Sequence, residues 1–328
     1  MVLVDVYGRP LFNLRIAVTR QCNLNCQFCH MEGEKKGVEN FAEEMSVDEI
    51  VRIVKIAVSL GISKVKLTGG EPLLREDISE IVKQVASLSG LTDFSMTTNG
   101  TALASLAEEL CANGLRRVNI SLPTLDEEVY GKLTGGKLAH VLEGVKAAVK
   151  VGFYPVKLNM LVLKGVNDMA VSEMIEFARE TGAILQLIEL EPLNINHVYY
   201  VANHKPLDEY ESMLKQKAVK VETRRYMQNR HVYYLPDVTV EVVHPIENTD
   251  FCLHCTRLRL TSDGKLKPCL MRNDNLVDVL TPMRNGASDK ELAGLFELAN
   301  QRREPYNNSS HKISKGLSNF AVADAQQN

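Results

Sequence analysis

The chain of 328 residues contains no tryptophan, few aromatic residues of any kind (6%) and no long uninterrupted apolar run. The missing run argues against a membrane-spanning helix, because such a helix needs about 20 predominantly apolar residues. The first ten residues also lack the basic and then apolar pattern of a signal peptide. We therefore expect a cytoplasmic protein without a membrane partner.

An excess of one charge is also lacking, since 38 lysines and arginines stand against 41 aspartates and glutamates, for a formal net charge of −3. This balance argues against nucleic-acid partners bound through bulk positive charge, although it allows a local basic pocket. The content of apolar residues (45%) and charged residues (24%) is ordinary for a globular enzyme. The length suits two domains, or one large α/β barrel with an appendage.

Seven cysteines are present, and an odd number without an export signal points to metal-binding or catalytic thiols rather than disulfides. Six of them form two sets of three. The sets have the spacings C-x3-C-x2-C and C-x2-C-x13-C, and their members are Cys22, Cys26 and Cys29, and Cys252, Cys255 and Cys269. Cys111 stands alone in a predicted helix, where we interpret it as a buried core residue.

Three thiolates are one fewer than the four that complete a structural zinc site or an iron–sulfur cluster. Two interpretations stay open. Each set could combine with other ligands to hold zinc in a binding protein without catalytic activity, or each could hold a [4Fe–4S] cluster with one iron left open. His30 is a poor fourth zinc ligand because it directly follows Cys29, so we expect it to pack or hydrogen-bond nearby. The open iron is favoured, because catalysis and ligand binding require an open position.

Short β-type runs alternate with helical patterns as far as residue 190, which indicates parallel βα repeats in a partial barrel or a doubly wound sheet. The predicted strands are 14–19, 64–68, 93–98, 117–122, 156–163 and 184–190. The predicted helices are 46–60, one from 77, 102–113, 138–151 and 168–181. Residues 232–244 alternate like an antiparallel hairpin.

Several predicted strands carry cations and amides on one face, because successive side chains of a strand point to opposite sides. Lys64, Lys66 and Thr68 share such a face. Comparable positions of other strands hold Arg15, Asn119, Ser121, Lys157 and Asn159. A closed barrel is filled by apolar side chains and a buried unpaired lysine is costly, so we expect an open or wide barrel that binds an anionic ligand. The alternative is a one-sided sheet whose polar face is in solvent.

The motif Thr68-Gly69-Gly70-Glu71-Pro72 directly follows the second predicted strand, at the end where βα enzymes place their active sites. Paired glycines let a ligand approach the backbone, and Glu71 offers a carboxylate to an ammonium group. The motif is weak alone. Together with the cysteines after the first strand it is a strong signal, because both loops lie at the same rim.

In joining C-x3-C-x2-C to Gly-Gly-Glu-Pro, the sequence resembles the radical S-adenosylmethionine superfamily. The resemblance implies a partial (βα)6 barrel and a [4Fe–4S] cluster on the first three cysteines, whose open iron is chelated by S-adenosylmethionine. One electron then cleaves this cofactor to a 5′-deoxyadenosyl radical, which abstracts a hydrogen atom. The residues implied to bind the cofactor are Phe28, Gly69, Gly70, Glu71, Asn99, Ser121 and Glu191.

The segment from Phe251 to Cys269 resembles more narrowly the auxiliary-cluster segment of the GTP 3′,8-cyclases, of the MoaA type and archaeal-like, which begin molybdopterin biosynthesis. The stretches GRPLFNLRIAVTRQCN, KVKLTGGEPLLRED, FSMTTNG, RVNISLPTLD and VKLNMLVLKGVND also match that pattern. The resemblance implies a lyase that forms 3′,8-cyclo-7,8-dihydroguanosine 5′-triphosphate, with a second [4Fe–4S] cluster whose open iron binds guanine. The residues implied to bind GTP are Arg15, Lys64, Lys66, Thr97, Lys157, Arg257, Leu258 and Arg259, of which Lys157, Arg257 and Arg259 are also taken as catalytic.

The resemblance also predicts domains and partners. We expect residues 1–220 to form the partial TIM-like barrel, 221–306 the C-terminal extension that forms an auxiliary-cluster domain, and 307–328 a flexible tail. The implied partners are GTP, a one-electron reductant of the flavodoxin or ferredoxin type, a downstream cyclic pyranopterin monophosphate synthase, and a second copy in a homodimer. The alternative is a radical maturase of a peptide or another cofactor. Arg257 and Arg259 beside lumenal lysines argue against it, since a peptide offers no dense phosphate charge.

Overall fold

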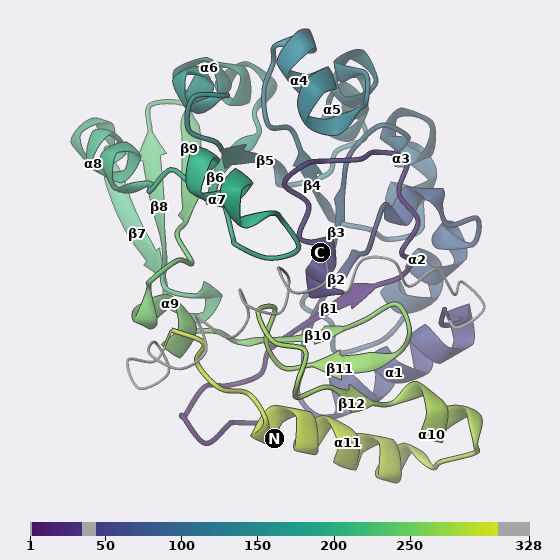
Figure 1. The fold of residues 1–328 in the computed structure, drawn as a ribbon. Helices are drawn as coiled ribbons and strands as arrows, with labels where there is room; N and C mark the ends of the chain where they lie inside the picture. Colours follow the sequence, from purple (N-terminus) through teal and green to yellow (C-terminus); the bar gives the residue numbers. More distant parts are fainter. Residues whose placement is uncertain (1, 35–43, 308–328) are drawn as a thin grey trace, which may run out of the picture.

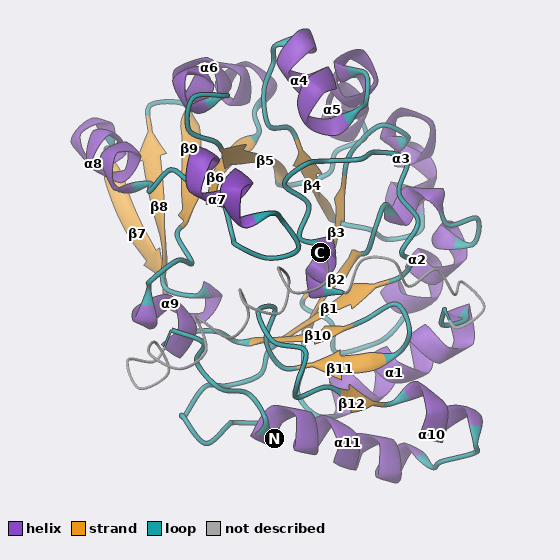
Figure 2. Cartoon of the chain, viewed as in Figure 1, coloured by secondary structure: helices purple, strands orange, loops and turns teal. Residues whose placement is uncertain are grey.

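The computed structural model describes residues 2–34 and 44–307, whose strands form a single curved sheet with helices around its outer side (Figures 1 and 2). The strands are β1 Asn13–Ala17, β2 Lys64–Thr68, β3 Asp93–Thr98, β4 Arg117–Ser121, β5 Val156–Val162, β6 Ile184–Glu189, β7 Lys220–Arg224, β8 Arg230–Leu235, β9 Val238–Val243, β10 Arg257–Leu260, β11 Lys265–Lys267 and β12 Val277–Asp278. The α-helices are α1 Val47–Ser59, α2 Ile78–Ala86, α3 Leu103–Ala112, α4 Glu127–Thr134, α5 Leu138–Lys150, α6 Val171–Thr181, α7 His197–Asn203, α8 Asp208–Lys217, α9 Thr249–Leu253, α10 Leu280–Arg284 and α11 Asp289–Gln301.

The sheet has the order β12-β11-β10-β1-β2-β3-β4-β5-β6-β9-β8-β7. Strands β1 to β6 are parallel, as the alternation of strands and helices predicts. Two strands from the C-terminal part extend this parallel set, since β10 pairs with β1 and β9 pairs with β6. The partial barrel is therefore confirmed, and the later segment widens it at both edges.

The predicted division at residue 220 falls at the first residue of β7. Strands from beyond this point join the same sheet at both of its sides, so the sheet is continuous across the predicted boundary. The predicted hairpin is confirmed as β8 and β9, although β9 also pairs with the barrel. Except for Asn307, the predicted tail lies outside the described residues.

Local signals in the sequence explain where the elements begin and which face they bury. Helix α1 begins with a capping box, in which Ser46 Oγ accepts from the backbone N–H of Glu49 and the Glu49 carboxylate accepts from that of Ser46. In β2, Val65 and Leu67 are buried toward the helices, whereas Lys64 and Lys66 line the inner cavity. Cys111 packs partly buried against the core, as interpreted. No helix of the described part of the chain is long and apolar enough to cross a membrane.

Candidate active site

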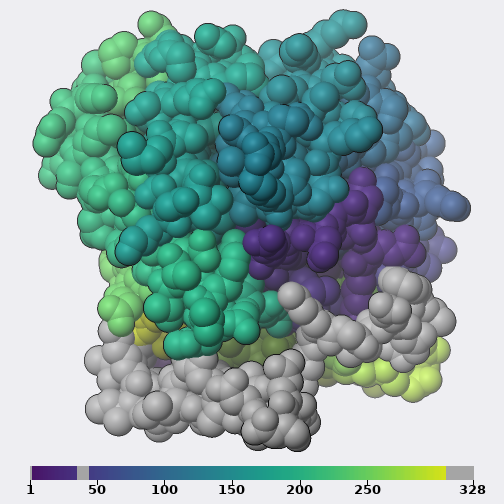
Figure 3. Space-filling view, turned by 45° about the horizontal axis from the view of Figure 1, so that its top comes forward, coloured from purple at the N-terminus to yellow at the C-terminus, as the bar shows by residue number. Residues whose placement is uncertain are grey.

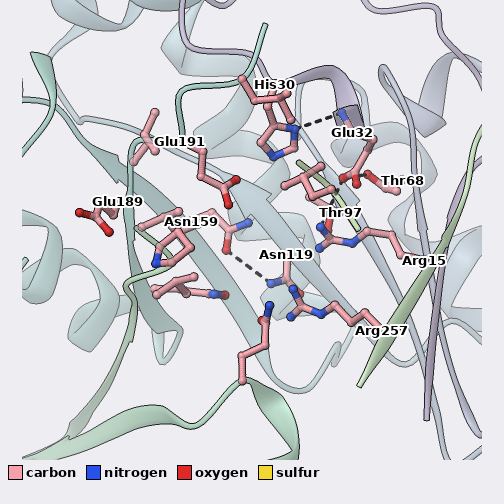
Figure 4. A pocket seen from close by; sticks show the side chains of 18 of the residues that line it. Arg15, His30, Glu32, Thr68, Thr97, Asn119, Asn159, Glu189, Glu191 and Arg257 are labelled. Atoms are coloured by element: carbon pink, nitrogen blue, oxygen red, sulfur yellow. Dashed lines mark hydrogen bonds and ion pairs between the residues drawn. The ribbon is translucent and has the colours of Figure 1, made fainter. Parts of the chain in front are cut away.

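A cavity of about 2540 Å³ occupies the inner side of the curved sheet and contains both sets of cysteines. Its wall is built by the polar face of the parallel strands, and loops that follow these strands form its rim (Figure 4). The predicted polar lumen is thus present, and the interpretation of this face as a solvent-covered one-sided sheet is wrong.

The loop after β1 brings Cys22, Cys26 and Cys29 to the cavity. The loop is attached to the end of α4 by two backbone hydrogen bonds, from Asn25 to Thr134 (2.9 Å) and from Gln27 to Leu133 (3.1 Å). Figure 3 shows this purple N-terminal segment at the surface beside the blue-teal segment around residue 130. The three thiols are therefore held at the rim of the barrel, as the motif predicts.

The thiols of the first set are electrostatically suited to a cationic metal cluster. Burial, together with the negative charges of the neighbouring Cys29 and Cys22 thiolates, raises the pKa of Cys26 to about 12. Burial also raises the pKa of Cys22. A thiolate set without a protein cation is stabilised by the metal that it binds, so the donor set fits an iron–sulfur cluster.

The paired glycines after β2 have a structural reason that the sequence does not reveal. A Cβ atom on Gly69 would lie 2.4 Å from the carbonyl oxygen of Thr19, and one on Gly70 would lie 2.1 Å from that of Gln21. Only glycine lets the two loops pack this closely. The two glycines therefore allow the cysteine loop to pack directly against the end of β2.

Glu71 occupies a different place from the one predicted. Its side chain is fully buried and is absent from the cavity lining. Its carboxylate accepts hydrogen bonds from Thr98 Oγ1 (2.6 Å) and from the backbone N–H groups of Asn99 (2.6 Å) and Leu73 (3.0 Å). Burial raises its pKa to about 7. Because its oxygens accept from these donors, Glu71 links the ends of β2 and β3, and its side chain does not line the cavity.

The other residues predicted to bind S-adenosylmethionine all line the cavity. The cavity lining contains Phe28, Gly69, Gly70, Asn99, Ser121 and Glu191. The Asn99 amide lies 4.0 Å from Cys22 Sγ and donates to Asn23 Oδ1 at 2.8 Å. His30 forms a hydrogen bond nearby, as expected, with its Nδ1 accepting from the backbone N–H of Glu32 at 3.0 Å (Figure 4).

The second set of cysteines lines the same cavity, with Cys252 on α9, Cys255 just beyond it and Cys269 after β11. Burial raises the pKa of Cys269 to about 11. Burial also acts to raise the pKa of Cys255, but the nearby guanidinium groups of Arg303 and Arg257 outweigh it and lower this pKa. Within residues 2–34 and 44–307, no group of three or more His, Cys, Asp or Glu side chains is placed to hold a single metal ion.

Two of the predicted GTP-binding arginines share a carboxylate that the sequence reasoning missed. Glu32 forms ion pairs with Arg15 (3.3 Å) and Arg259, and accepts a hydrogen bond from Thr68 Oγ1 (3.0 Å). Burial acts to raise its pKa, but Arg15 and Arg259 outweigh burial and lower the pKa to about 2. Glu32 is therefore ionised and orients both arginines. Its position three residues after Cys29 gave no signal of this role.

A second buried carboxylate, Glu241 on β9, pairs with Lys157 and with Arg224 (2.8 Å). Burial lowers the pKa of Lys157 to about 8, although Glu241 acts to raise it. Glu241 and Arg224 were also missed. The signal that could have revealed Glu241 is a single acidic residue at an inward position of the apolar run Val238-Thr239-Val240-Glu241-Val242.

The side chains of the remaining predicted contacts face the cavity, with one exception. Lys64, Lys66 and Thr97 line the cavity, and Lys66 Nζ donates to Asn119 Oδ1 at 2.8 Å. Arg117, which the sequence reasoning missed, lies nearby in an ion pair with Asp93. Arg257 also faces the cavity (Figure 4). The exception is Leu258, whose side chain is fully buried in the hydrophobic core on the opposite face of β10.

The widened parallel barrel, with a cysteine loop after β1 and paired glycines after β2, defines a radical S-adenosylmethionine protein. Residues 16–178 match the family described as "Radical SAM superfamily". The fold is similar to that of Streptococcus suis SuiB in a structure bound to S-adenosylmethionine, with a TM-score of 0.63 and 19% identity over 84% of this chain and 65% of SuiB. It is also similar to anSMEcpe with bound AdoMet, with a TM-score of 0.58 and 18% identity over 86% and 80% of the two chains. At these identities the likeness shows the fold alone.

Residues 183–309 match the family described as "Molybdenum Cofactor Synthesis C". The "Probable GTP 3′,8-cyclase" of Pyrococcus horikoshii is 51% identical over 312 residues, covering 93% of this chain and 98% of the relative. That of Methanocaldococcus jannaschii is 45% identical over 303 residues, covering 92% and 98%. The chain therefore belongs to the GTP 3′,8-cyclase family. This membership argues against the alternative that the chain is a radical maturase. Membership of the radical superfamily implies S-adenosylmethionine and a [4Fe–4S] cluster.

Proposed function

We propose that this chain converts GTP into 3′,8-cyclo-7,8-dihydroguanosine 5′-triphosphate for molybdenum cofactor biosynthesis. The observation that supports this most strongly is that two sets of three cysteines and a basic strand face share one cavity. When bound, the first cluster and S-adenosylmethionine supply a 5′-deoxyadenosyl radical, which removes hydrogen from C3′ of the ribose. The residues proposed to hold this cofactor are Phe28, Gly69, Gly70, Asn99, Ser121 and Glu191.

The strands supply the charge that a triphosphate needs. They contribute nine cationic side chains to the cavity against four acidic ones, Asp93, Glu189, Glu222 and Glu241. The cations are Arg15, Lys64, Lys66, Arg117, Lys157, Arg224, Arg230, Arg257 and Arg259. A wall enriched in guanidinium and ammonium groups binds phosphate oxygens by charge-assisted hydrogen bonds.

The second set of cysteines is proposed to hold an auxiliary [4Fe–4S] cluster that binds the guanine. Cys252, Cys255 and Cys269 all line the cavity, and a cluster held by these three thiols would have one iron without a cysteine ligand. The proposed partners are a flavodoxin- or ferredoxin-type reductant, a cyclic pyranopterin monophosphate synthase that takes the product, and a second copy of the chain.

The test is anaerobic incubation of the reconstituted protein with GTP, S-adenosylmethionine and dithionite. The proposal predicts equal amounts of 5′-deoxyadenosine and of a cyclic product with the mass of GTP. Formation of 5′-deoxyadenosine without any GTP-derived product would overturn the substrate while leaving the radical chemistry in place.

We expect the affinity for GTP to fall as the pH rises from 7 to 9. Lys157 has a pKa of about 8 because it is buried, so it is charged at pH 7 and largely neutral at pH 9. The loss of this one cation predicts about tenfold weaker binding at pH 9, by linkage of one proton to one ligand. Binding is measured anaerobically by titration calorimetry. Lys157→Arg keeps its charge and should flatten the profile, and an equally steep profile in this variant would rule out Lys157.

A further inference from the structure

Arg230 on β8 differs from the other buried arginines of the described chain. Four arginines are buried there, namely Arg9, Arg230, Arg259 and Arg303. Arg9 and Arg303 form ion pairs with Asp5, and Arg259 forms one with Glu32. In the same part of the chain, Arg230 has no carboxylate within ion-pair distance. A buried cation without such a partner is costly unless a ligand supplies the missing charge.

The strand directs Arg230 into the cavity. Arg230, Val232 and Tyr234 alternate along one face of β8 and all three line the cavity. The intervening His231 and Tyr233 face the other side, where both contact Glu211 of α8. The guanidinium therefore lies on the lumenal face, and its exposed fraction is only 8%.

The contacts of Arg230 orient the guanidinium without neutralising it. One terminal nitrogen donates to Gln228 Oε1 at 2.7 Å, which is a neutral acceptor. The Nε–H group is buried and has no hydrogen-bond partner. A buried, unsatisfied donor on a charged group is expensive, so an acceptor is expected at this place when the site is filled.

The neighbours of Arg230 are other cations of the lumen. Burial, together with the positive charges of Arg15 and Arg224, lowers the pKa of Arg230 to about 10, although Glu241 and Cys255 act to raise it. Arg230 in turn acts to lower the pKa of Arg257. Glu241 already forms ion pairs with Lys157 and Arg224. The anion that fits this gap is one with several charges and oxygen acceptors, which describes a triphosphate.

We propose that Arg230 donates to phosphate oxygens of the substrate, adding a phosphate-binding residue from the C-terminal part of the chain. This inference rests on the proposed function. It assigns to β8 a role in substrate affinity, with Gln228 as the residue that positions the guanidinium.

The test compares binding of GTP, guanosine and inorganic tripolyphosphate to the anaerobically reconstituted full chain. Arg230→Gln should weaken binding of GTP and tripolyphosphate by about 10- to 100-fold, the range expected for one charge-assisted hydrogen bond, and should change guanosine binding less than about twofold. Arg230→Lys should recover part of the loss. The matched control is His231→Gln, on the same strand but facing α8, which should bind all three probes normally.

Equal weakening for guanosine and GTP in Arg230→Gln would overturn the inference, because it would indicate a contact with the base or a structural role. Unchanged tripolyphosphate binding would overturn it as well. The proposed function is judged separately, because tripolyphosphate has neither ribose nor base. Wild-type protein that forms no cyclic product refutes the function, whereas the dependence of tripolyphosphate binding on Arg230 is measured without turnover.

Discussion

Replacement of Cys26 by serine is expected to abolish reductive cleavage of S-adenosylmethionine, lowering the rate at least about 1000-fold, or about 4 kcal/mol in barrier. Cys26 lies with Cys22 and Cys29 in the loop that the backbone of Leu133 and Thr134 fixes at the barrel rim. A hydroxyl replaces the thiolate poorly as a ligand of iron. The measurement is 5′-deoxyadenosine formed under dithionite, together with iron content.

The matched control for this prediction is Cys111→Ser. Cys111 lies on α3, where its Sγ donates to the backbone oxygen of Val151 at 3.5 Å, and it is absent from the cavity lining. Cys111→Ser should keep wild-type iron content and cleavage. The assignment of the first set fails if the Cys26 variant still cleaves the cofactor at the wild-type rate, or if the Cys111 variant loses as much.

Replacement of Cys255 by serine is expected to separate the two halves of the reaction. Formation of the cyclic product should fall at least about 100-fold, whereas cleavage of S-adenosylmethionine without GTP should change less than about twofold. The two activities should separate because the two sets lie on different segments. Cys255 lies beyond α9 next to Arg303 and Arg257, whereas the first set of cysteines follows β1. Iron should fall from about eight to about four per chain.

Parallel loss of both activities in the Cys255 variant would show that this set is structural. Unchanged iron would show that it holds no cluster. Near-wild-type product formation with four irons would remove the auxiliary cluster from the reaction. These outcomes are read from the same preparation by iron analysis and by chromatography of the two products.

The sequence predicted the parts of the molecule that depend on short-range pattern. The boundaries of β2 and β3 agree with the predicted runs at 64–68 and 93–98. The capping box at Ser46 is present. The alternation that placed Lys64 and Lys66 opposite Val65 also placed them in the cavity. These features follow from strand and helix periodicity, which neighbouring residues determine.

The features that escaped prediction depend on contacts between distant segments. The pairing of β10 with β1 joins residues about 240 positions apart, and no local pattern indicates it. Glu32 and Glu241 were missed because an inward carboxylate is recognised only from the cations that surround it. Leu258 was predicted to bind GTP together with its neighbours Arg257 and Arg259. Strand alternation directs its side chain into the core instead.

The contacts of Glu71, which lies within a sequence motif, also escaped prediction because they involve another segment of the chain. The residue type suits an ammonium ligand, but the fold uses its oxygens for Thr98, Asn99 and Leu73. The motif therefore contributes through the arrangement of two strand ends and the close packing of Gly70 against Gln21. The sequence predicted the location of the motif correctly, but not the protein contacts of its carboxylate.

In the proposed reaction, the radical generated at the first cysteine set reaches a GTP molecule held in the same lumen. The most direct test is turnover with GTP that carries deuterium only at C3′ of the ribose, followed by mass spectrometry of 5′-deoxyadenosine. We predict that the deuterium appears in 5′-deoxyadenosine as the cyclic product forms. Formation of the product with no deuterium in 5′-deoxyadenosine would contradict it.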